Sequence, residues 1–463
     1  MRQWPRNRQK IHVMVAFDDK PLLIRPFTQA CSDATRTGLA PTGPGRRLCP
    51  PVQEGDSIVG RIYIIGTCDT KAVELRYVHD LITGQGVPAV IVDVSTALRA
   101  PGPDSADTIP PTAIAAAHPD GTEAVFTRRR GSSIAAMATA LRHFLCARND
   151  ISGVLGIGGS GGTALIAPAL QALPLGLPKM MVSTVASGNV AAYVGGSDIA
   201  MVYSVTDMEG LNRLSRRILA NAANAMAGMA SHLPPAQHDP RPAVGLTMFG
   251  VTTPCVERIV SNLDDTFDCM VFHATGTGGR AMERMADSGQ LAGIIDVTTT
   301  EICDYLSGGI FPCDGDRLGA AIRTGVPYVG SCGALDMVNF GAPDTVPAHY
   351  RNRRLLEHNP QITLMRTSVD ECQAIGEWIG DRLNQCRGEV RFFLPEGGFS
   401  MLDRMGEPFY DPQADQALFE ALERTVEQTP RRRLIPLPYG VNDAAFADTL
   451  AVTFRSLFNG ENT

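Results

Sequence analysis

The sequence is poor in aromatic residues and has no excess of positive charge. Aromatic side chains account for 6% of the 463 residues, and the formal net charge is −7. Proteins that bind nucleic acids carry a basic surface, and those that bind single strands stack the bases on aromatic side chains. We therefore expect no nucleic-acid partner, although this charge is compatible with a local site for one nucleotide.

Paired cysteines with zinc-type spacing are also missing. None of the 11 cysteines forms a C-x-x-C pair, and no histidine-rich segment accompanies them. Several lie in apolar or helical runs, where a thiol behaves as a small buried hydrophobic group. This usage argues against a zinc ribbon and favours a reduced, cytoplasmic compartment.

The chain shows no convincing signal peptide, but it has one long run without charge. The apolar residues 11–17 include a histidine and are few for a signal peptide. Residues 151–178 carry no charge and are numerous enough to span a bilayer. A glycine loop at 158–162 interrupts them, and its amides would be unsatisfied in lipid. We therefore expect a buried strand, loop and helix there, and no membrane partner.

Three parts follow one another along the chain. Residues 1–57 are rich in arginine, proline and glycine, which predicts a flexible N-terminal extension. Residues 58–238 and 239–463 each alternate apolar strands with helices, as parallel sheets covered on both faces do. We therefore predict an α/β fold of two Rossmann-like subdomains with mainly parallel sheets.

The predicted elements are spaced evenly through both subdomains. Strands are expected at 62–65, 89–92, 153–157, 180–184, 244–249, 269–273, 293–297, 328–331 and 390–394. Helices are expected at 71–84, 164–173 and 207–232. Ser368 and Glu371 have the spacing of a capping box and predict a helix that ends near Leu383.

A glycine-rich run, residues 156–163, joins a predicted strand to a predicted helix. We assign to a ligand site its residues Gly158, Gly159, Ser160, Gly161, Gly162 and Thr163. Amides at a helix N-terminus attract anions, and glycines let a ligand approach the backbone. The run matches a phosphate-binding P-loop except that Gly162 stands where lysine is required. A tight turn that packs helix on strand is the alternative interpretation.

A second run of this kind lies in the other half of the chain. It consists of Thr275, Gly276, Thr277, Gly278, Gly279 and Arg280. Together with Ala281, two of its glycines fit a dinucleotide pattern, and Asp296 follows at the end of the next predicted strand. This spacing predicts a nicotinamide cofactor as an alternative ligand. Arg280 could bind a phosphate, but a structural turn with a surface arginine is also compatible.

Further polar residues lie where predicted strands end. Gly66, Thr67, Asp69, Thr70 and Lys71 follow the first strand. Lys71 could supply the cation that the glycine loop lacks, and Asp69 could hold Mg²⁺ through water. A helix cap made by the threonine and aspartate side chains is the alternative interpretation.

The segment that begins at Asp296 combines hydroxyl groups with the carboxylates of Glu301 and Asp304. It suits metal-bound water, acid–base work or simple helix capping. His273 is either a buried, hydrogen-bonded histidine or a catalytic one.

Eight motifs together resemble a known family. They are Gly66-Thr-x-Asp-Thr-Lys71, the run 156–163, Ser183-Thr-x-Ala-Ser-Gly188, Tyr193-Val-Gly-Gly-Ser-Asp198-Ile, Met248-Phe-Gly-Val-Thr-Thr253, Phe272-His-Ala-Thr-Gly-Thr-Gly-Gly-Arg280, Asp296-Val-Thr-Thr-Thr-Glu301 and Ala334-Leu-Asp-Met-Val-Asn-Phe340. The chain resembles a bacterial-type member of the ATP-binding family named for the tomato protein that resists tomato mosaic virus. The resemblance covers roughly residues 60–458.

This resemblance implies two Rossmann-like subdomains, ATP binding and self-association into homodimers. It supplies ATP, with Mg²⁺, where the residues alone indicate a phosphate-bearing ligand. Ser187 and Gly188, in the third motif, join the candidate site as another small-residue loop at a strand end.

Three functional hypotheses follow from these patterns. The first is an ATP-binding enzyme that acts on a small molecule in a cleft between the subdomains, with its reaction and catalytic residues unidentified. The second is an NAD-type oxidoreductase. The third is a non-catalytic interaction protein whose dimer is stabilised by ATP.

Overall fold

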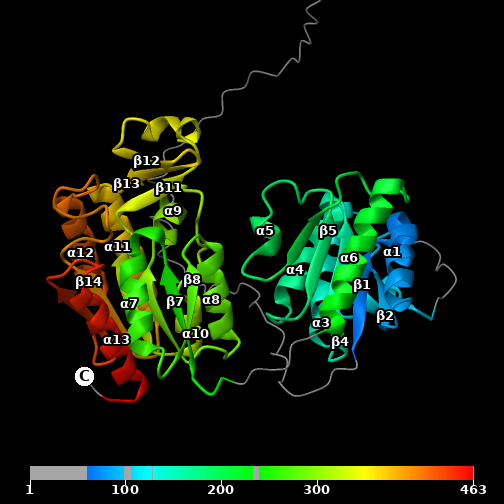
Figure 1. Cartoon of the computed structure of the whole chain (residues 1–463), viewed down its shortest axis with the longest axis horizontal. Coiled ribbons are helices and arrows are strands. Elements are labelled where there is room, and N and C mark those ends of the chain that lie inside the picture. The colour runs from blue at the N-terminus through cyan, green and yellow to red at the C-terminus, as the bar shows by residue number, and fades with distance from the viewer. Residues whose placement is uncertain (1–59, 98–105, 128, 233–238, 462–463) are drawn as a thin grey trace, which may run out of the picture. The chain divides into compact units, whose positions relative to one another are not determined.

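The computed structural model describes residues 60–97, 106–127, 129–232 and 239–461. The predicted N-terminal extension, residues 1–57, lies outside the described residues. Two α/β units are present, and each is described by itself (Figure 1). We call residues 60–232 the N-terminal subdomain and residues 239–461 the C-terminal subdomain.

The N-terminal subdomain contains a six-stranded parallel sheet with the order β3-β2-β1-β4-β5-β6. Its elements are β1 (Arg61–Gly66), α1 (Cys68–Thr83), β2 (Ala89–Asp93), β3 (Thr108–Ile109), α2 (Pro111–Ala115), a 3-10 turn (Thr122–Ala124), α3 (Arg130–Cys146), β4 (Ile151–Gly158), α4 (Ser160–Ala172), β5 (Lys179–Ser183), α5 (Ala191–Val194), β6 (Ala200–Tyr203) and α6 (Arg213–Ser231). All eight residues of β4 are buried, because helices cover both faces of the sheet.

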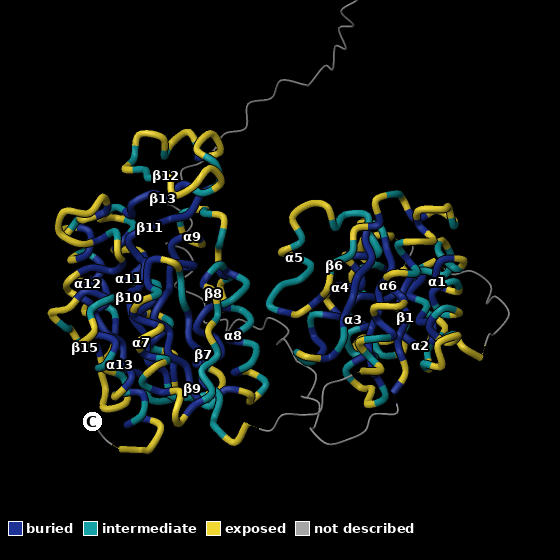
Figure 2. The backbone as a smooth tube through the Cα atoms, in the orientation of Figure 1, coloured by how far each residue is buried: buried dark blue, intermediate teal, exposed yellow. Residues whose placement is uncertain are grey.

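Each face of this sheet has its own hydrophobic core. Helices α1 and α6 pack through Leu75 and Met226 against one face, which includes Ile64 of β1. Helices α3 and α4 pack through residues such as Leu141 and Leu170 against the other face. Figure 2 shows the strands as a buried layer between helices whose outer surfaces are exposed.

The C-terminal subdomain contains a second six-stranded parallel sheet with the order β15-β14-β10-β9-β7-β8. Its main elements are β7 (Ala243–Met248), α7 (Thr253–Leu263), β8 (Asp268–His273), α8 (Thr277–Asp287), β9 (Gly293–Thr298), α9 (Glu301–Ser307), α10 (Gly319–Thr324), β10 (Tyr328–Gly333), α11 (Val369–Gln385), β14 (Val390–Pro395), α12 (Pro412–Thr425), β15 (Arg432–Leu437) and α13 (Ala444–Phe458). The remaining strands, β11 (Met337–Phe340), β12 (Leu355–Asn359) and β13 (Ile362–Arg366), form a separate antiparallel sheet.

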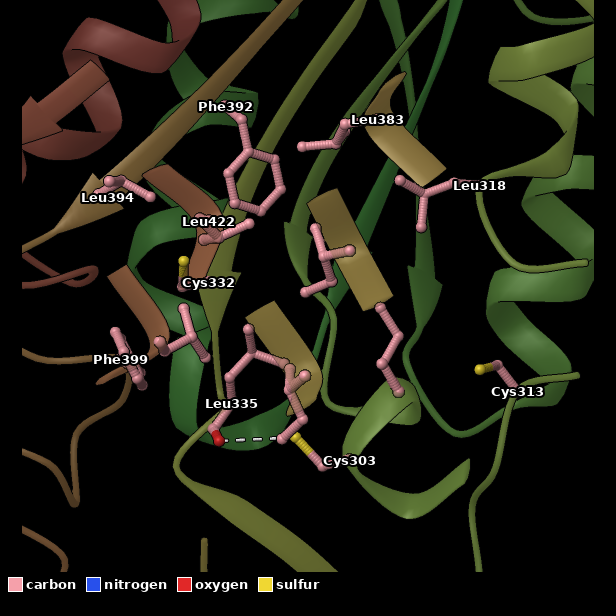
Figure 3. Packing of buried hydrophobic residues seen from close by; sticks show 14 of the residues in the cluster. Cys303, Cys313, Leu318, Cys332, Leu335, Leu383, Phe392, Leu394, Phe399 and Leu422 are labelled. Atoms are coloured by element: carbon pink, nitrogen blue, oxygen red, sulfur yellow. Dashed lines mark hydrogen bonds between the residues drawn. The ribbon is translucent and has the colours of Figure 1, made fainter. Parts of the chain in front are cut away.

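Free cysteines are part of the C-terminal core. Figure 3 shows Cys303, Cys313 and Cys332 among buried leucine and phenylalanine side chains, with the Cys303 thiol directed at the carbonyl oxygen of Leu335. Burial raises the pKa of the Cys372 thiol to about 12. These thiols are therefore protonated packing groups, as their apolar sequence context predicts.

The prediction of an α/β fold with two mainly parallel sheets is confirmed, and each predicted strand is present. The capping box of Ser368 and Glu371 is also present at the start of α11. The predicted boundaries of α6 were wrong, because its capping box is formed by Asn212 and Ser215 and not near residue 207. Helix α3, strands β6 and β15, and the antiparallel sheet were not predicted from the sequence.

The uncharged run 151–178 forms strand β4 and helix α4, as expected. Among the described residues, no helix has both the length and the apolar character needed to cross a membrane.

The cap of α6 allows a test of local stability. The side chain of Asn212 accepts hydrogen bonds from the amides of Leu214 (2.8 Å) and Ser215 (2.9 Å). We expect Asn212→Ala to lower the free energy of unfolding by about 1 kcal/mol, whereas Asn212→Asp keeps the acceptor and most of the stability. Urea denaturation measures both, and equal loss in the two variants would contradict the capping role.

Candidate functional site

A cavity of about 960 Å³ lies at the carboxyl ends of the strands in the N-terminal subdomain. It is lined by Thr67, Asp69, Thr70, Lys71, Val94, Thr96, Ala97, Phe126, Thr127, Arg130, Ser133, Ile134, Gly159, Ser160, Gly161, Gly162, Leu165, Thr184 and Asp207. Strand β1 pairs with β2 on one side and β4 on the other, so the chain reverses its direction of winding between β1 and β4. Open α/β sheets bind their ligands at such a switch point.

One wall of the cavity is the N-terminus of α4. Gly159 occupies the N-cap position and has no side chain to cap the helix. Across the described parts of the chain, no protein acceptor is hydrogen-bonded to the amides of Ser160, Gly161 or Gly162. Free amides and the positive end of the helix dipole together form a site for an anion.

The glycines of this wall leave space for a ligand. A Cβ placed on Gly161 would have no heavy atom within 4 Å, and one on Gly162 would meet only the Ile157 carbonyl oxygen at 3.8 Å. A Cβ on Gly159 would meet only the Thr184 hydroxyl, at 3.6 Å. Packing within the protein therefore does not require glycine at these three positions. Close approach of a ligand to the backbone would require it.

Two other residues of the run are needed for packing. A Cβ on Gly158 would lie 2.9 Å from the backbone of Gly162, so this glycine allows the helix to approach its strand. Thr163 is fully buried, and its hydroxyl lies 2.7 Å from that of Ser183 and 2.8 Å from the Gly159 carbonyl oxygen. Neither residue lines the cavity, and both support the loop from behind.

Of the predicted site residues that follow β1 and β5, some line the cavity and others lie outside its lining. Thr67, Asp69, Thr70 and Lys71 line the cavity. Gly66 is buried outside the lining, where a Cβ would lie 2.8 Å from the Leu75 side chain. Ser187 and Gly188 are exposed and outside the lining, which includes Thr184 from the same loop.

The N-terminus of α1 is satisfied by protein groups, in contrast to that of α4. The Cys68 amide donates to Asp93 Oδ1 (3.0 Å), and the Asp69 amide donates to the Ser95 hydroxyl (3.1 Å). That hydroxyl in turn donates to Asp93 Oδ1 (2.5 Å). Asp93 therefore fixes the loop that carries Asp69 and Lys71. Asp93 was not predicted as a site residue, although an acidic residue directly after the predicted strand 89–92 is a signal that could have identified it.

Charged side chains of both signs face the cavity. The Lys71 ammonium group donates to the Met208 carbonyl oxygen (2.6 Å), and Asp207 accepts from the Met208 amide (2.8 Å). Asp69 Oδ1 is buried and has no hydrogen-bond partner among the described residues. Arg130 is exposed at the first residue of α3. Neither Arg130 nor Asp207 was predicted as a site residue. Arg130 is the first residue of α3 and Asp207 follows β6, and neither element was recognised from the sequence.

Ser160 invites comparison with a hydrolase nucleophile, because Gly158–Gly162 has the spacing G-x-S-x-G between a strand and a helix. In a nucleophile elbow the serine has a strained backbone, but Ser160 has no positive φ. Among the described residues, the cavity lining contains no histidine that could act as its base. The arrangement therefore suits anion binding better than acyl transfer.

The second glycine run belongs to the C-terminal subdomain, and its amides are occupied. Glu301 Oε1 accepts hydrogen bonds from the amides of Gly276 (2.7 Å) and Gly279 (3.1 Å) at the start of α8. A Cβ on Gly279 would collide with the Glu301 carboxylate, and one on Gly278 would collide with the His273 carbonyl oxygen. A protein carboxylate thus lies where a bound phosphate would otherwise be held.

The carboxylates after β9 form a buried ionic network. The Arg317 guanidinium contacts Glu301 (2.9 Å), Glu283 (3.0 Å) and Asp296 (2.7 Å), and all four side chains are buried. Asp296 also accepts from the hydroxyl of Tyr328 (2.8 Å). Burial raises the pKa of Glu283 to about 7, although the positive charge of Arg317 opposes the shift. Asp296 is therefore engaged inside the protein and does not face a ribose site.

Asp304 and His273, the other two candidate residues, both contact other groups of the protein. Asp304 accepts from the amides of Asn339 (2.7 Å) and Phe311 (2.8 Å), and burial raises its pKa to about 7. Asp304 therefore ties α9 to the loop at Phe311 and to strand β11, and it does not cap the N-terminus of its own helix. His273 is exposed, and its ring stacks edge-on against Phe249 at 5.4 Å. No group of three or more metal-binding side chains occurs in the described ranges.

The ionic network predicts a large difference between two arginines. We expect Arg317→Met to destabilise the C-terminal subdomain by about 3–5 kcal/mol, because three buried carboxylates lose their common cation. Arg323→Met is the matched control: Arg323 also pairs with two carboxylates, but its side chain is 45% exposed. Its loss should cost about 1 kcal/mol or less in thermal or urea unfolding. Similar losses in both variants would contradict this assignment.

Comparison with known proteins assigns both subdomains to one family. The N-terminal domain of the uncharacterised protein family UPF0261 matches residues 60–235, and the C-terminal domain of that family matches residues 241–458. A UPF0261 protein of Mesorhizobium japonicum is 56% identical over 392 residues, which are 84% of this chain and 98% of the relative. A UPF0261 protein of Clostridium tetani is 40% identical over 399 residues, which cover 84% of this chain and 97% of that protein.

The ToMV resistance protein Tm-1 of Solanum lycopersicum is also similar, with 41% identity over 419 residues. The match covers 86% of this chain but only 56% of the tomato protein. The resemblance inferred from the sequence motifs is thereby confirmed at the level of the family, while none of these names specifies a ligand. The chain belongs to the uncharacterised protein family UPF0261.

Proposed function

We propose that this protein binds ATP in the cavity of the N-terminal subdomain, with the phosphates at the N-terminus of α4. One observation carries the proposal: the amides of Ser160, Gly161 and Gly162 face a cavity and have no acceptor in the described residues. Ser160 is exposed and Gly161 and Gly162 are half-buried, so a ligand can reach these donors, and a charged phosphate oxygen is a strong acceptor for them. The volume, about 960 Å³, is in the range of cofactor sites.

The other polar residues of the lining would complete a nucleotide site. Lys71 and Arg130 provide the positive charge that a P-loop obtains from its own lysine. Asp69 and Asp207 could hold Mg²⁺ through water, since Mg²⁺ on a nucleotide usually takes one or two protein carboxylates together with phosphate oxygens. The unpartnered Oδ1 of Asp69 supports this role, because a buried carboxylate oxygen requires a donor or a cation.

The dinucleotide alternative has less support from the geometry. The amides of Gly276 and Gly279 already bind Glu301, and Asp296 is engaged with Arg317. In the N-terminal subdomain, the strand order resembles that of dinucleotide-binding folds, but the glycine run follows β4 and not β1. We therefore retain ATP as the proposed ligand.

Whether the bound ATP reacts is a separate part of the proposal. We propose an ATP-dependent enzyme that acts on a small molecule, with a non-catalytic, ATP-stabilised homodimer as the competing function. Release of phosphate or AMP during incubation of the protein with Mg²⁺, ATP and pooled metabolites would support the enzyme. Constant ATP together with a nucleotide-dependent increase in molecular mass, measured by light scattering, would support the dimer.

A substitution in the glycine run separates binding from stability. We expect Gly161→Val to fold normally, because the space around its Cβ is empty, and to weaken ATP binding about a hundredfold by blocking access to the amides. Gly228→Val in α6 makes the same change at another helical glycine with empty surroundings, outside the cavity. Isothermal titration with ATP and Mg²⁺ compares them, and wild-type affinity in Gly161→Val would refute the proposed site.

Asp69 allows a test of the metal. We expect Asp69→Asn to reduce the gain in ATP affinity that Mg²⁺ produces, without lowering the affinity measured in EDTA, because only the carboxylate charge is lost. Asp80→Asn, in the same helix and 78% exposed, serves as the control. Titrations with and without Mg²⁺ measure this effect, and an unchanged Mg²⁺ dependence would exclude Asp69 from the metal site.

A further inference from the structure

We infer that Lys71 is a latch that couples the cavity to residues 204–210. Its ammonium group holds these residues against helix α1, and a phosphate bound in the cavity would release them by competing for that group. We call residues 204–210 the rim segment, because one of them, Asp207, lines the cavity. The inference rests on the proposed function, since it adds to the proposed ATP site a conformational response to the ligand.

Two hydrogen bonds connect the rim segment to α1. The Lys71 ammonium group donates to the Met208 carbonyl oxygen (2.6 Å), and the Gly210 amide donates to Glu74 Oε1 (2.7 Å). Lys71 belongs to the lining of the cavity, whereas Glu74 is 1% exposed and lies outside that lining. A ligand in the cavity can therefore compete for the first of these bonds. The second bond then reports whether the rim segment stays in place.

The rim segment contains a strained turn. The Thr206 amide donates to the Ser204 carbonyl oxygen (2.7 Å), so Val205 is the middle residue of a three-residue turn. Its φ of 63° lies in the left-handed region, which β-branched residues rarely adopt, and three-residue turns with positive φ are rare and strained. Val205 is 54% exposed, so burial of its side chain does not compensate for the strain. The turn therefore depends on the contacts that hold the rim segment in place.

Lys71 lies where α1 is interrupted. Its φ of −131° and ψ of 23° are not helical, although Cys68–Thr83 is otherwise one helix. Conformational changes in proteins are absorbed by a few residues in loops or at the ends of regular elements. The side chain that has to move is thus attached at a break in the regular backbone and not within a rigid helical turn.

A phosphate would be the stronger partner of the ammonium group. Lys71 donates to a neutral carbonyl oxygen, and a phosphate oxygen adds the attraction of opposite charges to such a hydrogen bond. Loss of the Lys71 bond would leave the rim segment with its Glu74 bond to α1, and the strain at Val205 would then favour release. The free energy stored in the turn would in this way contribute to the affinity for the ligand.

Hydrogen exchange at the Gly210 amide measures the latch. A ligand usually slows exchange near its site, but we expect saturating ATP with Mg²⁺ to speed exchange at Gly210 about tenfold in the wild type. In Lys71→Met this amide should exchange fast with or without ATP, because no ammonium group holds Met208. Arg130→Met removes another cation of the lining and is the control: without ATP, its Gly210 should exchange as slowly as in the wild type. The thermal midpoint of each variant confirms that it folds.

Relief of the strain gives a second test, at a residue outside the cavity lining. Asparagine adopts the left-handed region at lower cost than valine does. We expect Val205→Asn to stabilise the latched form, and so to slow Gly210 exchange without ATP and to weaken ATP binding about threefold to tenfold. Val452→Asn in α13 is the control, because Val452 is also exposed (64%) and lies in the other subdomain. Isothermal titration should give the wild-type affinity for this control.

The possible outcomes separate this inference from the proposed function. If the wild type binds no ATP, the proposed function fails and the latch fails with it. If ATP binds but slows Gly210 exchange or leaves it unchanged, Lys71 does not release the rim segment, and the latch is refuted while the ATP site stands. Unchanged ATP affinity in Val205→Asn would likewise refute the release of strain on binding.

Discussion

The site depends on a single physical constraint: the first amides of a helix have no partner within the helix. This protein meets that constraint in two opposite ways. At α8 the amides of Gly276 and Gly279 bind the carboxylate of Glu301, whose charge Arg317 balances in turn. At α4 the corresponding amides face a cavity and no acceptor from the described residues reaches them. Similar glycine runs thus close one helix end and leave the other open to a ligand.

The surroundings of the glycines explain this difference. In the run after β8, glycine is required because neighbouring protein atoms fill the space that a side chain would occupy. In the run 156–163, Gly156 and Gly158 are required for packing, while a Cβ on Gly159, Gly161 or Gly162 would meet no heavy atom closer than 3.6 Å. Selection for packing accounts for the first case. In the second, the proposed ligand would account for the glycines, because it would need close contact with the backbone.

The loop after β1 also depends on which groups accept hydrogen bonds from the first amides of a helix. Asp93 and Ser95 satisfy the first amides of α1, so that helix end is not an anion site and instead presents side chains to the cavity. Under the proposed function, Lys71, Asp69 and Arg130, which line the cavity, would serve a nucleotide and its metal. Phosphate and metal would then be bound by different chemistry within one cavity.

The sequence by itself determined the fold class, most strands and the glycine runs, because continuous apolar runs and glycine spacing are local signals. It also indicated the family, through motifs spread over both subdomains. Tertiary structure decided which run is open, since Glu301 lies 22 residues beyond Gly279 and its occupancy of those amides follows from packing. Tertiary structure likewise placed Thr163 and Gly66 behind the site and brought Phe126, Arg130 and Asp207 into it. A local pattern can identify a helix end with free donors, but only the folded chain shows whether protein or a ligand supplies the acceptor.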